Sequence, residues 1–343
     1  MSAARELLER LLEGIDLTQA EAETLLGLLT DGTAAPAMIG AVLAALRAKG
    51  AVADEVRGFA EAMRRLARPP ALPRGLRAID IVGTGGDRSG SLNISTGTAL
   101  LTAACGLPVI KHGNRSVSSR SGSADVLEAL GLPMPLDEQA AGNCLAACGF
   151  TFLFAPHYHS ATQAVAAARR ALGVRTVFNI LGPLTNPAHP PLRLIGAFSL
   201  PVAQLMAESL AGMQIERAFV VHGAEGWDEP TPVGPFTLFE VRPGQVHREV
   251  RRPEDYGLEC CSSAALAGGD AEHNAAALRA VLRAESHGAH RDCLLLGTAL
   301  ALEVAGEVHS PHAGIERAAR AIDSGAAADL LGRLERVGAA HGR

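Results

Sequence analysis

Apolar residues recur at helical spacing through the first 68 residues of the chain. Four leucines that share one helical face come first: Leu7, Leu8, Leu11 and Leu12. The capping box Thr18-Gln19-Ala20-Glu21 opens a second helix. Pro36 fits the first turn of a third helix and Gly50 fits its end. Residues 52–66 are expected to form a fourth helix. The pattern predicts a small N-terminal helical domain over residues 1–68, followed by a proline-rich linker at 69–77.

After this linker the pattern changes. Short apolar runs are followed by glycine-rich turns and by Ala/Leu-rich stretches, an alternation typical of a parallel sheet with crossover helices. We expect strands at residues 78–82, 109–112, 152–155, 194–198 and 218–222. We expect helices at residues 96–105, 123–130, 137–148, 159–172, 201–213 and 271–283. Residues 230–256 alternate around proline and glycine and predict a β-rich excursion or flap. Residues 78–343 are thus expected to form a larger α/β domain with a mainly parallel sheet.

Composition narrows the class of protein. A length of 343 residues favours two structural units, and 48% hydrophobic with 20% charged residues is ordinary globular usage. The net charge of −5 and 3% of aromatic residues argue against nucleic acid or an acidic membrane as a partner. The six cysteines show no C-x-x-C spacing, so we expect core thiols. No stretch resembles a membrane helix or a secretion signal, and we expect a cytoplasmic protein.

The strongest local motif is a glycine-rich turn, Gly83-Thr-Gly-Gly-Asp87, between an apolar strand and a helix. Such a turn lets backbone N–H groups approach an anion, and the helix that follows adds a favourable dipole. It is not a dinucleotide fingerprint, because Arg88 stands where the third glycine would fall, and it lacks the Lys-Ser/Thr of a P-loop. We interpret it as a phosphate-binding turn; a purely structural glycine corner is the alternative.

Polar side chains crowd the residues after this turn. They are Ser91, Asn93, Ser95 and Thr96. Helix capping explains one or two of them. The others predict neutral donors to a diphosphate, or an oxygen that faces a metal ion.

A basic segment, Lys111-His-Gly-Asn-Arg115 with Ser116 to Ser119, follows the apolar residues 107–110. It therefore lies at the C-terminal end of a predicted strand, the edge of an open α/β sheet where ligands bind. Two cations and several hydroxyls in one loop predict a second phosphate-binding segment; solvation of a surface loop is the alternative.

Two adjacent carboxylates, Asp228 and Glu229, follow the predicted strand at 218–222. Mg²⁺ takes one or two carboxylates and completes its shell with water and phosphate oxygens. Acidic residues in a loop are more often only solvated. Together with the two phosphate-binding segments, however, they predict a magnesium-assisted diphosphate site.

These residues resemble one known family, the anthranilate phosphoribosyltransferases. The motifs that carry the resemblance are Gly83-Thr-Gly-Gly-Asp87, Asn93-Ile-Ser-Thr96, Lys111-His-Gly-Asn-Arg115 with Ser118-Ser119, residues 122–131, residues 175–187, Asp228-Glu229, residues 268–271 and residues 45–50. The resemblance implies a nucleoside phosphorylase/phosphoribosyltransferase-like fold, with a site in the cleft between the two domains. It also implies a homodimer formed through the helical domain, onto which part of residues 173–193 would pack.

The resemblance also implies a role for each matching residue. The diphosphate of phosphoribosyl pyrophosphate would lie at Gly83, Gly86, Asp87, Ser91, Asn93, Ser95, Thr96, Lys111, Ser119 and Ser123, with Ile94 and Ser118 in the same binding segments. Mg²⁺ would lie at Ser95, Asp228 and Glu229. Anthranilate would lie near Gly83, Asn114 and Arg169, with His112 close by. The catalytic set would be Lys111, His112, Asp228 and Glu229, and the reaction would transfer the phosphoribosyl group to the amine of anthranilate.

The sequence departs from the family pattern on the acceptor side. Ser160-Ala-Thr-Gln163 and Ala167-Ala-Arg169 replace the usual Pro-Ala-Met-Lys and Pro-Val-Arg, and residues 230–234 differ as well. Another arylamine is therefore an open alternative as acceptor. A pyrimidine nucleoside phosphorylase and a non-catalytic paralogue that binds nucleic acid are the other readings.

Overall fold

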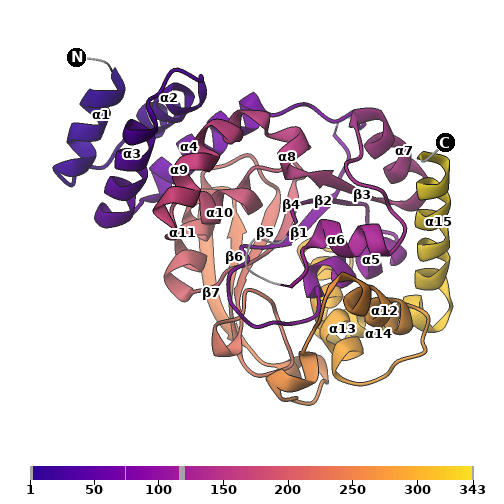
Figure 1. Cartoon of the computed structure of the whole chain (residues 1–343). Helices are drawn as coiled ribbons and strands as arrows, with labels where there is room; N and C mark the ends of the chain where they lie inside the picture. The colour runs from indigo at the N-terminus through magenta and orange to yellow at the C-terminus, as the bar shows by residue number, and fades with distance from the viewer. Residues whose placement is uncertain (1–2, 74, 116–119, 342–343) are drawn as a thin grey trace.

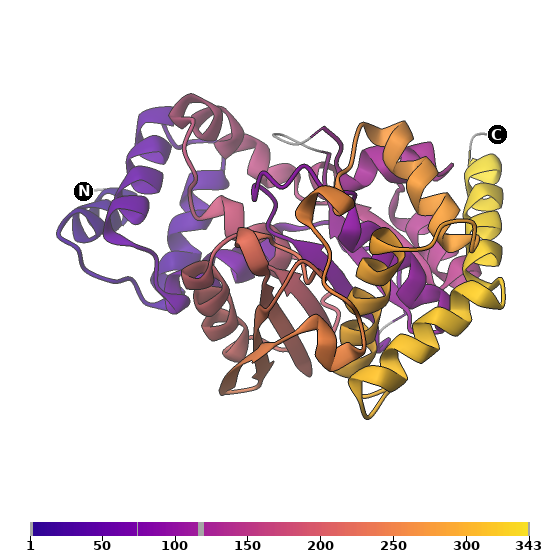
Figure 2. The same ribbon diagram turned by 90° about the horizontal axis from the view of Figure 1, so that it is seen from below.

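The computed structural model describes residues 3–73, 75–115 and 120–341 of the chain. Figure 1 shows a lobe of helices beside a larger lobe built around one sheet, with the N-terminus on the helical lobe and the C-terminus at the far side of the sheet. The view in Figure 2 shows the same two lobes side by side. The predicted fold class, helices followed by an α/β part with a mainly parallel sheet, is confirmed.

Four helices open the chain: α1 (Ala3–Leu12), α2 (Gln19–Thr30), α3 (Pro36–Lys49) and α4 (Ala53–Leu66). The predicted capping box is present, because Thr18 accepts from the backbone N–H of Glu21 while the Glu21 side chain accepts from the Thr18 N–H. Pro36 occupies the first turn of α3 and Gly50 ends that helix with a positive φ of 89°. The local signals in the sequence thus set the ends of these helices.

Later segments of the chain join the N-terminal helices in one apolar core. Helices α9 (Gln163–Leu172), α10 (Phe178–Leu181) and α11 (Leu200–Ala211) contribute buried residues to it. Helix α9 packs against both α2 and α3, as the ribbon in Figure 1 also shows. The boundaries at residues 68 and 77 and the 173–193 contact stay predictions.

The sheet has seven strands in the order β3-β2-β1-β4-β5-β6-β7. Five are parallel: β1 (Ile79–Gly83), β2 (Val109–Gly113), β3 (Phe150–Phe154), β4 (Leu192–Gly196) and β5 (Arg217–His222). Strands β6 (Phe236–Arg242) and β7 (Gln245–Arg251) extend it as an antiparallel hairpin. The β-rich segment predicted within residues 230–256 is confirmed by this hairpin. It is part of the sheet and not a flap, because Phe236 and Leu238 on one face of β6 and Val241 on the other are buried in the two cores.

Helices cover both faces of the sheet. Alternate strand residues divide between two cores, so that Ile81 and Leu194 join one and Ile195 and Val220 join the other. The second core is the one that contains α11 and the N-terminal helices. The first contains α5 (Ile94–Ala104), α6 (Ser123–Ala129), α7 (Glu138–Cys148), α12 (Ala271–Leu282), α13 (Ala289–Val304), α14 (Pro311–Asp323) and α15 (Ala326–His341).

Most expected helices appear within two residues of their predicted ends. The exception is the helix expected at 159–172, where α8 (Ala155–Tyr158) and a 3₁₀ turn, Ser160–Thr162, precede α9. The six cysteines are unpaired. Along the described residues, no helix combines the length and the apolar character needed to cross a bilayer.

The packing of α2 on α4 yields a first prediction. A methyl group on Gly58 of α4 would lie 2.3 Å from the Gln19 carbonyl oxygen and 2.7 Å from Cβ of Ala22. Because backbone cannot move aside cheaply, we expect Gly58→Ala to lower the free energy of unfolding by about 1–3 kcal/mol in urea titrations. Gly27→Ala is the matched control: a methyl there meets nothing within 4 Å, and we expect a gain of up to ~1 kcal/mol. Equal stability of the two variants would contradict this account.

Candidate active site

Three polar segments that lie far apart in the sequence meet at the C-terminal edge of the parallel strands. Asp228, beyond β5, accepts a hydrogen bond from the Gly85 N–H in the turn after β1, and the Thr84 hydroxyl lies 3.4 Å from the same oxygen. Glu229 accepts from the Ser95 N–H at 3.1 Å, and Lys111 of β2 donates to the Ser95 hydroxyl at 3.3 Å. The structure therefore brings the glycine turn, the basic segment and the two acidic residues together.

Three glycines make room for the acidic segment. Gly83 and Gly196 are neighbours on β1 and β4, and added methyl groups would lie 2.4 Å from Asp228 Oδ2 and 1.6 Å from the Asp228 carbonyl oxygen. A methyl on Gly223 would lie 2.3 Å from the Glu229 carbonyl oxygen. The backbone of residues 228–229 thus rests directly on strand ends that lack side chains, which explains why glycine stands at these positions.

The turn after β1 adopts left-handed backbone at Gly85 and Gly86, with φ of 72° and 76°, and again at Arg88, with φ of 64°. Turns with backbone in this conformation can expose several N–H groups to one side, a geometry suited to anions. Arg175 donates to the Gly86 carbonyl oxygen while its guanidinium lies 4.0 Å from the centre of the Phe198 ring. Arg175 was not among the predicted site residues, although it opens a motif that the sequence analysis singled out.

Lys111 is only 1% exposed, and its ammonium also donates to the Ile81 carbonyl oxygen. Burial lowers the pKa of Lys111, and the carboxylates of Asp80, Glu229 and Asp228 oppose that shift. The surrounding carboxylates are the reason why a cation is tolerated at this depth.

The imidazole of His112 is buried beside Lys111. Its Nδ1 lies 3.1 Å from the Gly182 carbonyl oxygen, so Nδ1 carries the proton and Nε2 is left as an acceptor. Burial and the nearby His159 lower the pKa of His112 to about 3. This histidine is therefore neutral at pH 7 and is a weak base.

The two acidic residues carry raised pKa values. Burial raises the pKa of Asp228 well above its usual range, and the carboxylates of Glu229 and Asp87 raise it further. Glu229 is partly exposed as a residue, but its carboxylate lies deep enough that burial raises its pKa to about 7, against the opposing effect of Lys111. Asp87 lies close by, with Oδ2 3.4 Å from the Asp228 backbone nitrogen. Three carboxylates share one anionic cluster.

This cluster fits a magnesium site. The part of the chain that the structure describes contains no group of three or more His, Cys, Asp or Glu side chains arranged to hold a metal. The predicted set instead combines the hydroxyl of Ser95 with the carboxylates of Asp228 and Glu229. Mg²⁺ needs few protein ligands, since water and phosphate oxygens complete its shell. A divalent cation would also relieve the like-charge repulsion that raises both pKa values.

The polar residues at the start of α5 have different surroundings. The Ser91 hydroxyl accepts from Ser89, and Thr96 Oγ1 is buried with no hydrogen-bond partner among the described residues. Asn93 holds the N-cap position but makes no capping hydrogen bond through its side chain. Ile94 is 1% exposed in the core, so only its backbone can contact a ligand.

The two cations predicted at the end of β2 and in the loop after it contact different parts of the protein. Arg115 is paired with Asp125 and Glu128 of α6, at 2.6 Å and 2.5 Å. Of the two predicted cations, it is Lys111 that lies near Asp228 and Glu229. Asn114 is exposed, and its carbonyl oxygen accepts from Ser123 at 3.2 Å. Ser118 and Ser119 lie outside the described residues.

Arg169 comes from the other lobe. It lies on α9, with its guanidinium 5.0 Å from the centre of the Phe178 ring, and burial lowers its pKa. Within the described ranges no carboxylate lies within salt-bridge distance of it. A half-buried guanidinium without a protein carboxylate is ready to bind one from a ligand.

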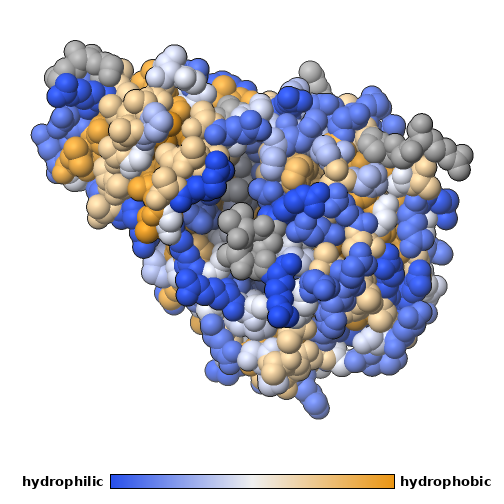
Figure 3. All heavy atoms as spheres, viewed as in Figure 1, coloured by the Kyte–Doolittle hydropathy of each residue, from blue (hydrophilic) through white to orange (hydrophobic). Residues whose placement is uncertain are grey.

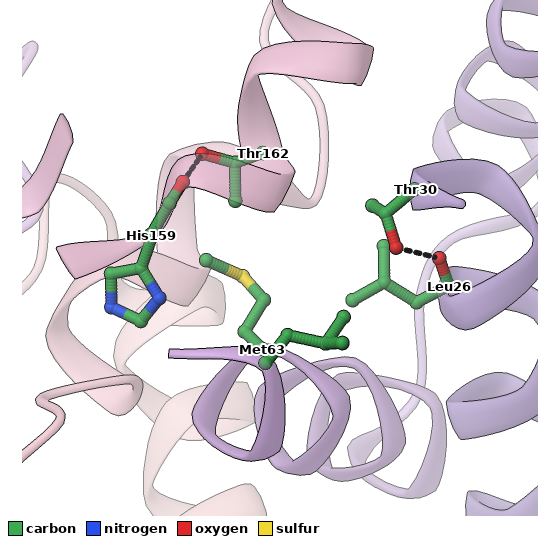
Figure 4. A pocket seen from close by; sticks show the side chains of 6 residues that line it. Leu26, Thr30, Met63, His159 and Thr162 are labelled. Atoms are coloured by element: carbon green, nitrogen blue, oxygen red, sulfur yellow. Dashed lines mark hydrogen bonds between the residues drawn. The ribbon is translucent and has the colours of Figure 1, made fainter. Parts of the chain in front are cut away.

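A small cavity lies between the lobes, close to His112. Figure 4 shows His159 and Thr162 on one side of it, Leu26 and Thr30 of α2 on the other, and Met63 of α4 between them. The His159 ring lies 5.0 Å from that of His112, and burial lowers the pKa of His159 to about 4. Thr162, one of the departures from the family pattern, thus faces the contact between the lobes.

Two buried polar residues at the site were missed by the sequence analysis. Asp80 accepts from the His112 N–H at 3.2 Å and from Asn186 at 2.9 Å, and Asn274 donates to Asn93 at 2.7 Å. Asp80 could have been found from the sequence, since it is an acid inside an apolar strand. No sequence pattern identified Asn274, because 181 positions separate it from Asn93.

Comparison with known proteins assigns the chain to a family. Residues 5–67 match the helical bundle domain of a glycosyl transferase family, and residues 75–328 match its a/b domain. An anthranilate phosphoribosyltransferase from Desulforudis audaxviator is 47% identical over 96% of this chain and 95% of its own length; one from Methylobacterium nodulans is 45% identical over 98% and 99%.

Solved structures give the same result. The anthranilate phosphoribosyltransferase of Thermus thermophilus superposes with a TM-score of 0.91 at 39% identity, covering 98% of this chain and 99% of that one. The Saccharomyces cerevisiae enzyme in complex with PRPP and Mg superposes with a TM-score of 0.88 at 27% identity, covering 98% of each chain.

The helical bundle domain, the a/b domain and these relatives define a glycosyltransferase, specifically a pentosyltransferase. Within that class, the chain belongs to the anthranilate phosphoribosyltransferase family.

The raised pKa of Glu229 yields a prediction for metal binding. The folded protein keeps a proton on Glu229 up to about pH 7, whereas an unfolded glutamate releases it near 4.5. Its contribution to stability is therefore complete below the unfolded value and is lost as pH rises through about 7. Mg²⁺ competes with this proton. We expect Mg²⁺ to raise the melting temperature more at about pH 8 than at about pH 6.

Glu229→Gln is the control for this experiment, because it keeps the shape and the acceptor for the Ser95 N–H but removes the titrating proton. We expect this variant to respond to Mg²⁺ less strongly and almost equally at the two pH values. A wild-type response that does not change with pH would contradict the proton competition.

Proposed function

We propose that this chain transfers the phosphoribosyl group of phosphoribosyl pyrophosphate to the amine of anthranilate, giving N-(5-phosphoribosyl)anthranilate and pyrophosphate. The observation that carries the proposal is the meeting of the glycine turn, buried Lys111 and the Asp228–Glu229 pair at one edge of the sheet. Family membership supports it, since relatives 43–47% identical over nearly their whole length carry this activity.

On the donor side, the diphosphate would bind where backbone and side-chain donors converge. The N–H groups of the turn at Gly86 and Asp87 and the hydroxyls of Ser91 and Ser95 surround the start of α5, whose N-terminus favours negative charge. The ammonium of Lys111 would add a buried positive charge. Gly83, Asn93, Thr96, Ser123 and, outside the described residues, Ser118 and Ser119 complete the proposed donor site.

The metal would lie at Ser95, Asp228 and Glu229. Mg²⁺ bound there stabilises the negative charge that develops on the leaving pyrophosphate. The contribution of the chain is to hold two carboxylates and a hydroxyl within one anionic cluster, fixed by the Gly85 and Ser95 N–H groups.

On the acceptor side, Arg169 would bind the carboxylate of anthranilate, with Asn114 and the neutral His112 near the ring. The amine nitrogen then forms a bond to ribose C1 as the bond from C1 to the pyrophosphate oxygen breaks, and the nitrogen releases a proton to solvent. An arylamine is already neutral at pH 7, so the reaction needs no strong base. The weakly basic His112 beside the ring is compatible with this. The rate enhancement comes from positioning the two reactants and from stabilising the leaving group.

A homodimer and a cytoplasmic location belong to this proposal. Apolar residues gather over the helices of the N-terminal lobe (Figure 3), where Leu12 is 64% exposed and Ile15 44% exposed. Exposed apolar residues on the helical lobe suit a contact with a second copy. Sedimentation of the purified protein tests the dimer.

Another arylamine acceptor is the second candidate function. It is favoured by Thr162, which lines the cavity beside His159 where the family pattern has the larger methionine. A screen of ring-substituted anthranilates and other arylamines separates the two candidates, because a true alternative acceptor would be turned over faster than anthranilate.

The function is tested by following anthranilate fluorescence with purified protein, phosphoribosyl pyrophosphate and Mg²⁺, with EDTA as the control. We expect a metal-dependent loss of signal. Asp228→Asn combined with Glu229→Gln removes both charges at nearly constant shape, and we expect turnover to fall about 100-fold or more with the melting temperature not lowered. Wild-type turnover in this double variant would remove the two carboxylates from the metal site.

Arg169 yields a separate prediction. A hydrogen bond between charged groups contributes roughly 1.5–3 kcal/mol, so we expect Arg169→Ala to raise the KM for anthranilate about 10- to 100-fold. The KM for phosphoribosyl pyrophosphate should stay within about twofold. Arg170→Ala is the matched control, since this neighbouring arginine is exposed and we expect both constants to be unchanged. An equal rise in both KM values for Arg169→Ala would exclude the acceptor role.

A further inference from the structure

The side chain of Asn93 is committed to two partners that lie away from its own helix. Its Oδ1 accepts from Asn274 Nδ2 at 2.7 Å, and its Nδ2 donates to the Ser121 carbonyl oxygen at 3.2 Å. These contacts explain why Asn93 stands at the N-cap of α5 without capping it through its side chain. Something other than helix stability therefore determines where this amide points.

Asn274 is 1% exposed on α12, and its own orientation is fixed by backbone. The Gly269 N–H donates to Asn274 Oδ1 at 2.7 Å. Since a backbone N–H can only donate, the oxygen of Asn274 must face Gly269 and its NH₂ group must face Asn93. The hydrogen-bond network thus leaves one assignment for the two ends of the Asn274 amide.

The same donor and acceptor reasoning applies to the Asn93 amide. Because Asn274 presents a donor, Asn93 turns its oxygen toward α12 and its NH₂ group toward the Ser121 carbonyl oxygen. The Ser121 hydroxyl, 3.4 Å from the same oxygen of Asn93, supports this orientation. An NH₂ group has two hydrogens, and the Ser121 carbonyl oxygen accepts one. Asn93 as a residue is partly exposed, and its second amide hydrogen is the one that we assign to a ligand.

The backbone before α12 is attached to the same loop. The Leu92 N–H donates to the Leu266 carbonyl oxygen at 3.0 Å, and the Gly268 N–H donates to the Gly90 carbonyl oxygen at 2.8 Å. A methyl group on Gly268 would lie 2.4 Å from the Ser91 carbonyl oxygen, so glycine is required for this approach. The backbone pairing fixes the position of the loop, and Asn274 adds the orientation of one side chain on it.

We propose that Asn274 is a positioning residue of the donor site, which orients the Asn93 amide so that its NH₂ group faces the diphosphate. The inference rests on the proposed function, in which Asn93 belongs to the donor site. A flipped Asn93 would present its carbonyl oxygen to the anion, and repulsion would replace a hydrogen bond.

Asn274→Asp tests the proposal, because it preserves shape and still accepts from the Gly269 N–H but cannot donate as a carboxylate. The introduced carboxylate would repel the Asn93 oxygen and favour a flipped amide, which loses its hydrogen bonds with Ser121. We expect the KM for phosphoribosyl pyrophosphate to rise about tenfold or more, which corresponds to at least one charged hydrogen bond, while the KM for anthranilate stays within about twofold. Asn143→Asp on the exposed face of α7 adds the same charge elsewhere and should leave both constants unchanged.

A double-mutant cycle separates orientation of Asn93 from a general structural effect. In an Asn93→Ala background, Asn274→Asp should cause no further rise in the donor KM. An equal rise in both backgrounds would overturn the proposal, because Asn274 would then act through the loop and not through the amide. Should Asn274→Asp fail to fold by circular dichroism, Asn274→Ala enters the same cycle, with the same non-additivity expected.

These experiments also distinguish failure of the positioning role from failure of the proposed function. Donor turnover by the wild type with an unchanged donor KM in Asn274→Asp would overturn the positioning role and leave the function standing. Absence of donor binding by the wild type in calorimetry would overturn both.

Discussion

The site depends on one constraint: the backbone of Asp228 and Glu229 lies directly against the ends of three strands, where glycines leave no side chain in the way. Gly83, Gly196 and Gly223 leave no side chain between the sheet and this segment. The acidic residues can therefore reach the turn after β1 and the first turn of α5. Since close packing at backbone distance leaves little freedom, the carboxylates are held in place before any ligand arrives.

The electrostatics of the site follow from this packing. The same burial that fixes the carboxylates also raises their pKa values, and the ammonium of Lys111 opposes this effect at Glu229. A protein usually avoids such an excess of like charge, since each buried charge needs compensation. The resting site is thus electrostatically incomplete, and a cation together with an anion of high charge density would complete it.

Sequence patterns predicted the architecture well because its signals are local. The box at Thr18 and Glu21, the glycine turns and the apolar runs set the helices and strands within a few residues, and the rule that parallel strands end at one edge predicted which loops meet. Contacts between distant residues were not predictable. Arg115 turns to α6 because Asp125 and Glu128 offer it two carboxylates, and Asn274 reaches Asn93 only because α12 folds back over α5.

The shared core of α9 and the N-terminal helices affects how this protein can evolve or be recombined. The chain enters the helical lobe twice, first through α1 to α4 and again through α9, which packs on α2 and α3. A chimera that exchanged only the first 68 residues would place α9 against foreign helices. The segment with Arg169 and Thr162 must therefore be inherited together with the bundle beneath it. The proposed acceptor side would thus depend on two separate stretches of the chain, whereas most of the proposed donor side lies on the sheet lobe.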